Sequence, residues 1–411
     1  MDKRIYWVWL QGALGCGYAH TGRLLRTFGS AERVWLADEQ ALRAAGLTGA
    51  VLKKAMNKAV DKAGKQLRVA VACGWQVWTP DMPEYPAPWK EIADPPLVIY
   101  ATGALPADWQ QRPVVTILAT RRISTNGLLL TGKIAAGLAT GGVIVAGDTI
   151  SGGDAAVMAA VASVGGCGIL LQPCGLDVSY PKTTEYLRDE IVKGGGVMLS
   201  EFPAGTAVRK ENYRLRNRLL AALPHAMIVT EAPDPSGTLQ VARLASTNGR
   251  DVFAVPGDLV THAGCHQLIR EQAMLVRGAE DVARELSIKF PSLDVKLVAN
   301  AEQTYVPRPP KDPVKAPVKK KSLRAVTHRE SPEIKLLPTE PLPELSVADL
   351  PASISDNAKC ILPHLTERPQ GLEELTEKTP LSLPQAMMAL TELELCGVAE
   401  SHAGGRYSRK G

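Results

Sequence analysis

The sequence predicts an α/β fold organised around a parallel sheet, and three regularities between residues 113 and 258 support this prediction. Six short apolar runs start about 25–29 residues apart, which is the length of one strand with its crossover helix and loops. The runs are apolar throughout, as strands buried on both faces must be. Nearly every run is followed by a loop rich in Gly, Pro or polar residues. The runs begin at Val114, Val143, Gly168, Val197, Ala226 and Asp251.

The loops that follow these runs are the first place to expect a binding site. In an open parallel sheet, the loops at the carboxyl ends of the strands line the ligand crevice. The sequence lacks both a G-x-G-x-x-G pattern after the first strand and a G-x-x-x-x-G-K-[ST] pattern. Dinucleotide and P-loop nucleotide cofactors are therefore not indicated, and we expect no cofactor.

Composition places the chain among ordinary soluble proteins of several domains. It has 411 residues, of which 45% are hydrophobic and 22% charged. The sequence contains neither an apolar run long enough to span a bilayer nor a signal peptide at its start. The seven cysteines are scattered without a C-x-x-C pair, which favours neither disulfides nor a metal site. We expect a cytoplasmic protein that needs no membrane and no metal.

Charge is concentrated in one segment. Between Arg308 and Arg329 eight Lys and Arg residues face a single Asp, a net charge of +7, whereas the whole chain carries +5. The remainder of the chain therefore sums to −2, and DNA affinity in folded parts must come from local patches. The Pro-rich and charged stretch 296–352 is predicted to be a disordered linker. It would serve as a tether, or would add nonspecific attraction for phosphate.

Three folded regions surround this linker. Residues 1–65 read as a small helical domain in which paired glycines, as in Gly46–Gly49, separate short helices. Such turns are typical of helix-hairpin-helix modules that hold a nucleic-acid backbone, or of a small interaction domain. Residues 66–295 form the sheet core, with a strand at 97–100 expected at its edge because prolines precede it. Residues 353–411 have the three helices and hairpin of a winged helix, a domain that binds DNA in some proteins and protein in others.

Two groups of arginines follow strands of the predicted core. Arg121 comes between the first strand and a helix that begins near Ser124, where free amides and the helix dipole favour an anion. A guanidinium there can bind phosphate through two hydrogen bonds. Arg214, Arg216 and Arg218 are predicted at the start of another helix, where their charge opposes the dipole unless an anion offsets it. Both groups predict phosphate binding, and solvated arginines are the alternative.

No catalytic set accompanies these arginines. Four acidic residues fall near strand ends, but no His lies beside a nucleophile among the loops. Each acid could equally cap a helix or pair with an arginine. The four are Asp154, Asp177, Glu201 and Glu231.

Several motifs in series resemble the bacterial DNA-processing protein A family (DprA, also called Smf). They are TRR at 120–122, GLDVSYPK at 175–182, SEFPAG at 200–205, YRLRNRLLAAL at 213–223, EAPDPSGTLQVARLA at 231–245, GRDVFAVPGD at 249–258 and GCHQLI at 264–269. The resemblance implies an extended Rossmann-like core, a helix-hairpin-helix or SAM-like N-terminal domain and a C-terminal winged helix. It also implies a non-enzymatic protein that binds single-stranded DNA without sequence preference and loads a RecA-type recombinase on it during natural transformation. Homodimers would form through the core.

The resemblance carries DNA contacts onto particular residues of this sequence. They are Arg121, Lys182, Arg216, Asn217 and Arg218, with Gly237 in an adjacent loop. The sequence departs from the family pattern in three places: Ala119 stands where Gly is usual, Ala146 replaces a serine, and Met158 replaces a histidine. The last two departures predict weaker DNA contacts from the second loop, residues 146–158.

A nucleotide-hydrolysing enzyme is the alternative function. Rossmann-like proteins of the lysine-decarboxylase-like group cleave nucleoside monophosphates with a Gly-Gly-x-Gly-Thr-x-x-Glu loop. The corresponding loop here, Pro235–Gln240, keeps the Gly-Thr pair but has no acid at the required position. The sequence therefore favours DNA binding over hydrolysis.

Overall fold

The computed structural model describes residues 2–150, 152–307, 354–366, 370–396, 398–402 and 406–409. These residues belong to two compact units, which divide between Val318 and Lys319. Most of the predicted linker, from residue 308 onward, lies outside the described residues. No described helix is long and apolar enough to cross a membrane.

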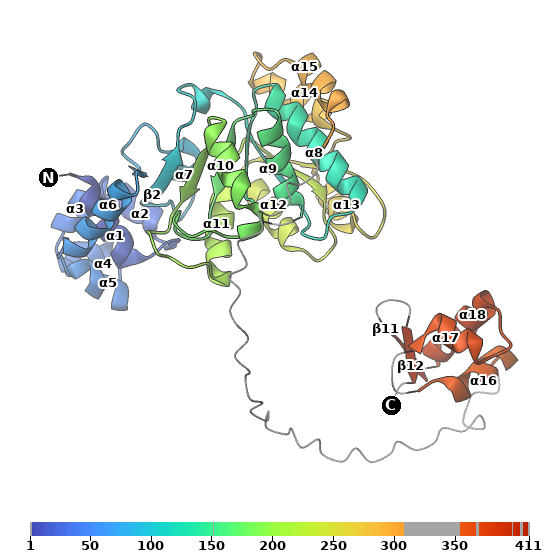
Figure 1. Ribbon diagram of the computed structural model, residues 1–411. Coiled ribbons are helices and arrows are strands. Elements are labelled where there is room, and N and C mark those ends of the chain that lie inside the picture. Colours follow the sequence, from blue (N-terminus) through green and yellow to red (C-terminus); the bar gives the residue numbers. More distant parts are fainter. Residues whose placement is uncertain are drawn as a thin grey trace, which may run out of the picture. The chain divides into compact units, whose positions relative to one another are not determined.

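A nine-stranded sheet forms the centre of the first unit (Figure 1), in the order β1-β2-β6-β5-β4-β3-β7-β8-β9. The strands are β1 (Gln76–Trp78), β2 (Ile99–Gly103), β3 (Val114–Ala119), β4 (Ile144–Gly147), β5 (Gly168–Leu171), β6 (Val197–Ser200), β7 (Ala226–Glu231), β8 (Asp251–Ala254) and β9 (Met274–Leu275). The pairs from β6 to β9 are parallel, while β1 and β2 are antiparallel to their neighbours. The six apolar runs of the sequence are β3 to β8, so the predicted α/β fold with a Rossmann-like parallel sheet is confirmed.

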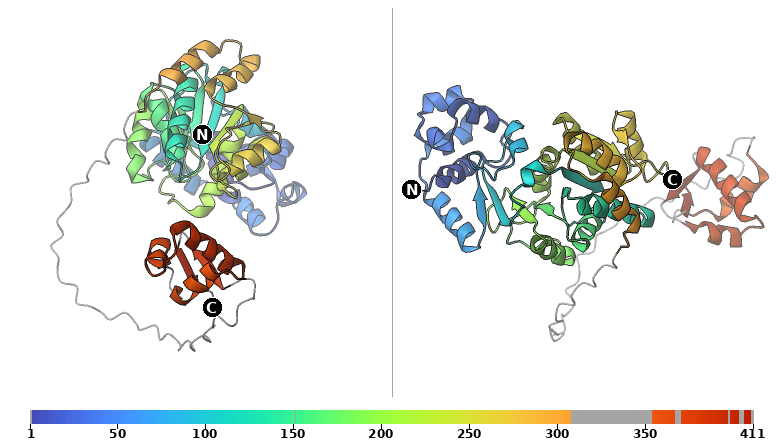
Figure 2. Two further views of the ribbon diagram at one scale, coloured as in Figure 1. Left: turned by 90° about the vertical axis from the view of Figure 1, so that its right-hand side faces the viewer. Right: turned by 90° about the horizontal axis from the view of Figure 1, so that it is seen from above.

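Helices cover both faces of this sheet (Figure 2). They are α7 (Ala87–Glu91), α8 (Thr125–Thr140), α9 (Gly153–Ser163), α10 (Glu185–Lys193), α11 (Lys210–Ala222), α12 (Gly237–Thr247), α13 (Ala263–Arg270), α14 (Ala279–Lys289) and α15 (Val295–Thr304). Side chains of α7 and α11 to α13 pack in one apolar core, and those of α8 to α10, α14 and α15 in another. Since every residue of β3, β4, β5 and β7 is buried, both faces of these strands are apolar.

The strand order reverses at β3. The chain proceeds from β3 through β4, β5 and β6 on one side, and then crosses to β7, β8 and β9 on the other. The loops that leave β3 and its neighbours diverge at this point, which opens a crevice at their carboxyl ends.

Six helices precede the sheet and pack against its first strands. They are α1 (Arg4–Leu14), α2 (Thr21–Phe28), α3 (Ala31–Leu36), α4 (Glu39–Ala44), α5 (Gly49–Met56) and α6 (Asp61–Ala72). Ser30 and Asp38 cap α3 and α4 with their side chains. The apolar core of these helices includes Val77, Val98 and Tyr100 from the strand region. The boundary expected after residue 65 falls inside α6, which continues to Ala72 before β1 begins at Gln76.

Two other expectations about the first unit are wrong. The strand expected at the sheet edge is β2, and it lies between β6 and β1, so β1 forms the edge instead. The linker expected from residue 296 begins later, because residues 295–304 form α15 and pack against α8. The reason is a tertiary contact: Gly141 leaves space on α8 for the side chain of Val298, and Gly137 lets Glu302 and the Val298 carbonyl approach closely.

The second unit is a winged helix, as predicted. It contains α16 (Asp356–Ile361), α17 (Leu372–Glu377) and α18 (Leu383–Leu395), and a three-stranded sheet of β10 (Gln370–Gly371), β11 (Ala399–His402) and β12 (Arg406–Arg409). Ser355 caps α16, and Ser382 with Gln385 forms a capping box on α18. A separate apolar core holds the unit together.

Candidate nucleic-acid interface

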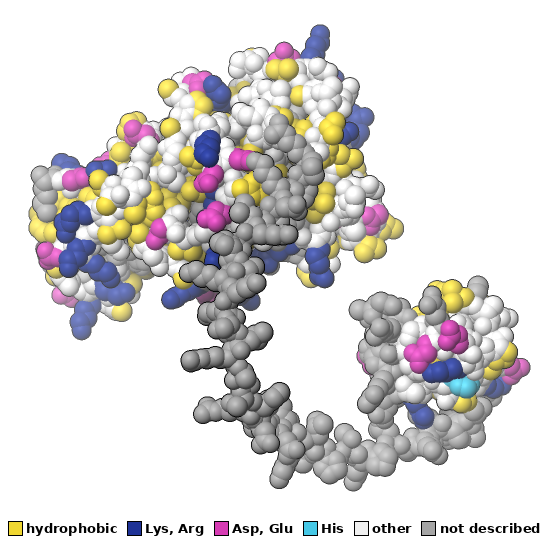
Figure 3. Space-filling view, in the orientation of Figure 1, with side chains coloured by type: hydrophobic (Ala, Val, Ile, Leu, Met, Phe, Trp, Pro, Cys, Tyr) yellow, Lys and Arg dark blue, Asp and Glu magenta, His cyan; other side chains and the backbone are white. Residues whose placement is uncertain are grey.

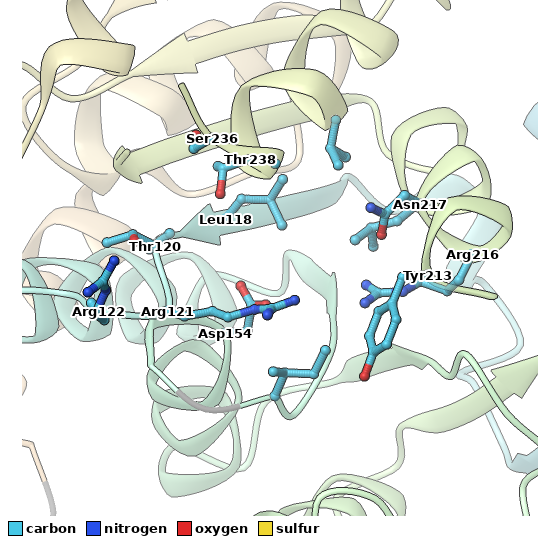
Figure 4. Close-up of a pocket in the computed structure, with 15 residues that line it drawn as sticks. Leu118, Thr120, Arg121, Arg122, Asp154, Tyr213, Arg216, Asn217, Ser236 and Thr238 are labelled. Carbon is cyan, nitrogen blue, oxygen red and sulfur yellow. The ribbon is translucent and has the colours of Figure 1, made fainter. Parts of the chain in front are cut away.

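A pocket of about 590 Å³ opens at the carboxyl ends of β3, β4 and β7 (Figure 4). Four segments line it: residues 118–122 after β3, Ile150 and Asp154 around the start of α9, residues 236–238 at the start of α12, and one side of α11. The pocket therefore lies at the point where the strand order reverses, as the sequence predicts for a ligand crevice.

Arg121 lies on the rim of this pocket and is exposed. Figure 4 shows its side chain extending across the pocket toward Arg216 and Tyr213. No acidic partner binds Arg121 among the described residues. Its guanidinium is therefore available to an anion that enters the pocket.

The helix that follows Arg121 is capped by the protein itself. Ser124, the N-cap of α8, accepts a hydrogen bond from the amide of Gly127 at 3.0 Å. Its own amide and hydroxyl donate to the buried carboxylate of Glu231 at 2.9 and 2.6 Å. The sequence places a phosphate at this helix start, but the structure fills the position with Glu231. Arg121, not the α8 amides, is thus the group of this loop that is left available to an anion.

Two glycines of the second loop hold the Arg121 backbone in place. The amide of Gly153 donates to the carbonyl oxygen of Thr120 at 3.2 Å. Gly152 has a φ of 83°, and a Cβ atom there would collide with the carbonyl of Arg121. The second loop therefore positions the first, a role that sequence comparison of its side chains could not reveal.

Arg216 and Arg218 are buried in ion pairs. Helix α11 begins at Lys210, so neither arginine stands in its first turn, and the expected conflict with the helix dipole does not arise. The Arg216 Nη2 lies 2.7 Å from Asp148 Oδ2. Arg218 donates through Nη2 to both carboxylate oxygens of Glu201 at 2.7 Å. The anions that offset these arginines are carboxylates of the protein.

Only one of these two arginines reaches the pocket. Arg216 lines it together with Asn217, whereas Arg218 is absent from its lining. Arg218 instead binds Asp94 through Nε at 3.0 Å and so links α11 to the segment before β2. Burial raises the pKa of Glu201, and Arg218 opposes that shift.

Asp154 brings a carboxyl group into the same pocket. Its Oδ1 is buried and has no hydrogen-bond partner among the described residues. Burial and the neighbouring Asp148 raise the pKa of Asp154 to about 7, while Arg216 and Arg121 act in the opposite direction. Near neutral pH this carboxyl group is therefore part protonated, and its charge changes within the physiological range.

Tyr213 supplies an aromatic face at the pocket wall. It is half-buried on α11, and its ring centre lies 5.7 Å from the Arg216 guanidinium carbon. A half-exposed ring beside cations is the usual platform on which single-stranded bases stack. Sequence reasoning did not select Tyr213. The signal available was an aromatic residue one helical turn before Arg216.

The remaining predicted residues lie in different places. Gly237 is the first residue of α12, next to the N-cap Ser236, and a Cβ there would meet nothing within 4 Å. The Ser236 hydroxyl accepts from the amide of Leu239 at 3.4 Å, so a ligand can approach the α12 amides of Gly237 and Thr238 from the pocket. Lys182 is exposed in a short 3₁₀ helix, Lys182–Thr184, outside the pocket lining. Across the described ranges no group of His, Cys, Asp and Glu could hold a metal ion.

Comparison with known proteins identifies the family. The family model described as DNA recombination-mediator protein A matches residues 76–287, and the model described as the DprA winged helix domain matches residues 343–405. The chain belongs to the DprA family of DNA recombination mediators.

Individual DprA and Smf proteins show the same relationship. Protein Smf of a Synechocystis strain is 28% identical over 415 residues, which span all of this chain and 99% of that protein. DNA processing protein DprA of Streptococcus pneumoniae is 38% identical over 203 residues, or 49% of this chain and 71% of that protein. Its X-ray structure superposes with a TM-score of 0.58 and 27% identity, over 68% of this chain and 97% of that one.

The family match covers the pocket. All four lining segments fall within residues 76–287, whereas the helices α1 to α6 precede the match. The resemblance stated from sequence motifs is therefore confirmed for the core and the winged helix.

Proposed function

We propose that this DprA-family chain binds single-stranded DNA without sequence preference in the pocket and loads a RecA-type recombinase on it, as a cytoplasmic protein of natural transformation. The observation that carries the proposal is the convergence of Arg121, Arg216 and Tyr213 on one open pocket. Cations for phosphate beside an aromatic face for bases are the two components of sequence-independent single-strand binding.

The charges in the pocket decide which residue contributes most. Arg216 is already paired with Asp148, so its net charge toward a ligand is small. Arg121 forms no such ion pair with a described residue, although it interacts electrostatically with Asp154, so it can offer more charge to a phosphate than Arg216 can. Asn217 and the α12 amides near Gly237 add hydrogen-bond donors that do not distinguish bases when they bind phosphate. We propose Arg121 as the principal contact and Arg216, Asn217 and Gly237 as supporting ones.

A salt-dependent titration tests DNA binding in the pocket. Arg121→Ala should weaken binding to all homopolymeric single strands alike and should lower the salt slope by roughly 0.7 for the lost phosphate contact. Arg270→Ala removes an exposed arginine on α13, outside the pocket, and serves as the matched control. Equal affinity and slope for wild type and Arg121→Ala would exclude the pocket as the DNA site.

Recombinase loading is supported by the family description as a recombination mediator. A purified RecA-type recombinase should assemble faster on single strands covered by a single-strand-binding protein when this chain is added, as measured by its DNA-dependent ATPase. Arg121→Ala should reduce this stimulation because the mediator must hold the strand. Absence of stimulation by the wild-type chain, with DNA binding intact, would reject loading while leaving DNA binding in place.

Exposed apolar side chains at the last strands support a homodimer through the core. Leu259 and Val260, in the loop after β8, are 82% and 77% exposed, and Met274 and Leu275 of β9 are also exposed. Exposed apolar residues gathered at one edge of a sheet mark an interaction surface. Leu259→Glu with Val260→Glu should convert a dimer into a 44.0 kDa monomer in sedimentation experiments. A wild type that is monomeric at the same concentration would contradict this proposal.

Nucleotide hydrolysis is the second candidate, and Asp154 is the observation that favours it. A carboxyl group with a pKa of about 7 in a pocket can transfer protons at neutral pH. In α12, however, Val241 stands where the hydrolases have the glutamate that follows Gly-Thr-x-x. Release of free base from nucleoside monophosphates by wild type, and its loss in Asp154→Asn, would favour nucleotide hydrolysis over DNA binding as the function of the pocket.

A further inference from the structure

The N-terminal helices carry a positive net charge, whereas the rest of the first unit does not. Residues 1–72 contain twelve Lys and Arg against five Asp and Glu, a net charge of +7. Because residues 308–329 also sum to +7 and the whole chain to +5, the remainder carries −9. Of this −9, residues 73–307 carry −3, from twenty Lys and Arg against twenty-three Asp and Glu. A polyanion near the first unit is therefore attracted to the N-terminal helices more than to the rest of that unit.

Local acids do not neutralise this charge. Glu32 pairs with Lys3, Glu39 with Arg43, and Asp2 with Arg4. The other two acids lie at helix starts, where Asp38 caps α4 and Asp61 begins α6. Eight exposed cations remain without an acidic partner within the helices described: Arg23, Arg26, Arg33, Lys53, Lys54, Lys62, Lys65 and Arg68.

The turn between α4 and α5 provides a surface for a phosphate. Gly46 and Gly49 have φ values of 99° and 53°, and residues 48–50 are exposed with small side chains. No side chain caps the first turn of α5 and no acid lies in it, so in this described segment its amides are open to an anion.

Three of the unpaired cations belong to this turn. The Arg23 Nη2 donates to the carbonyl of Ala44 at 3.3 Å, which holds its guanidinium at the turn. Lys53 and Lys54 follow on α5. Figure 3 shows Lys and Arg side chains gathered at the lower left, over the region of α3 to α5. Cations and open amides thus occupy one end of the helical region.

We propose that the α4–α5 turn with Arg23, Lys53 and Lys54 is a second binding site for a nucleic-acid phosphate backbone, separate from the pocket. Small side chains at the turn let a phosphate reach the amides, and Lys53 and Lys54 lie in the last turn of α5, one helical turn further along. The site recognises the charged backbone and not bases, because donors to the backbone carry no sequence information. A single strand that continues beyond the pocket and a duplex beside it both present this chemistry.

Neutralising the site tests the proposal on the full chain. The variant Arg23→Gln/Lys53→Gln/Lys54→Gln removes three exposed charges, and Lys193→Gln/Arg270→Gln/Lys296→Gln removes three from exposed positions of the core. Binding of long single strands and of duplexes is then measured against salt. For the first variant we expect at least tenfold weaker binding in low salt to one or both ligands, with a slope smaller by roughly 2 for single strands or roughly 2.7 for duplex. The control variant should lose little.

Each outcome gives a decision. Weaker binding of the first variant to single strands alone, to duplex alone or to both supports the site and shows which form of nucleic acid it binds. Equal binding of the two triple variants to both ligands would overturn the proposal. It would also be overturned if polyglutamate displaced the bound ligand as strongly as unlabelled DNA does, which would indicate an acidic protein partner. Unchanged tryptophan fluorescence and urea midpoint show that the variant is folded. Because Arg121→Ala tests the pocket separately, the failure of one site leaves the other intact.

Discussion

Replacing Arg218 by Ala should destabilise the first unit more than replacing Arg121 or Arg216 does. The guanidinium binds Glu201, which is 3% exposed, through two hydrogen bonds of 2.7 Å, and also contacts Asp94. Without it, Glu201 is left as a buried charge with no cation beside it. Breaking such a buried pair by removing one partner costs about 3–5 kcal/mol in the free energy of unfolding.

Protonation of Glu201 sets an upper limit on this loss. Keeping a carboxyl group neutral at pH 7 costs about 1.4 kcal/mol for each pH unit above a reference pKa of about 4.3, or about 3.7 kcal/mol. We therefore expect a loss of about 3–4 kcal/mol at pH 7. Because burial already raises the pKa of Glu201 and Arg218 opposes the rise, the variant has a higher pKa than wild type. Its stability deficit is smallest in acid and grows as pH rises between the two pKa values.

Tryptophan fluorescence in urea measures this effect on the relevant unit. All seven tryptophans fall between residues 7 and 109, and Trp89 donates to the carbonyl of Leu219, next to Arg218. The signal thus follows the first unit without the winged helix. Adding Glu201→Gln to Arg218→Ala should recover part of the loss, as a double-mutant cycle requires of interacting residues. A stability of Arg218→Ala equal to wild type, or a deficit that is the same at pH 5 and pH 8, would refute the buried-pair reasoning.

Three further outcomes are expected at the pocket. DNA affinity should fall roughly two- to tenfold from pH 6 to pH 8 as Asp154, with its pKa of about 7, loses a proton beside Arg121, and Asp154→Asn should abolish this fall in fluorescence anisotropy titrations. Gly152→Ala should weaken DNA binding as much as Arg121→Ala and lower the free energy of unfolding by about 1–2 kcal/mol, because the added methyl group displaces the Arg121 carbonyl. A Gly152→Ala variant with normal DNA affinity would show that the second loop does not position Arg121 for binding. Tyr213→Leu should cost about 1–3 kcal/mol of binding free energy and Tyr213→Phe almost none, and equal losses in both would argue against stacking.

The sheet could be predicted from the sequence because its strands are buried on both faces. That burial makes β3 to β8 continuous apolar runs, and the crossover helices space them regularly. Short strands with mixed burial were harder: β9 has two exposed residues and β1 only three residues in all, and neither has a periodicity to detect. The start of α11 was misplaced because no side chain caps it at Arg209, so the usual N-cap signal is missing.

The partners of the arginines could not be predicted from local sequence. Asp148 lies 68 residues before Arg216, and Glu231 lies 107 residues after Ser124. Only the arrangement of strands brings these groups together. The sequence alone therefore cannot distinguish arginines that are paired with carboxylates from arginines that are available to DNA. The structure separates Arg121, which lies at the rim and forms no ion pair with a described residue, from Arg218, which is paired with carboxylates of the protein. The role of Gly152 was hidden for the same reason, since its contact is with backbone from another loop.

The shared core of the N-terminal helices and the first strands has a consequence for how a long strand can follow the protein. Val77, Val98 and Tyr100 pack among the side chains of α1 to α6, so those helices cannot swing on a hinge relative to the sheet. The pocket and the α4–α5 turn are therefore held at one constant separation. A DNA strand that contacts both sites must span this fixed distance. The affinity for single strands should therefore rise in a step at the oligonucleotide length that first spans the two sites, and not gradually with length.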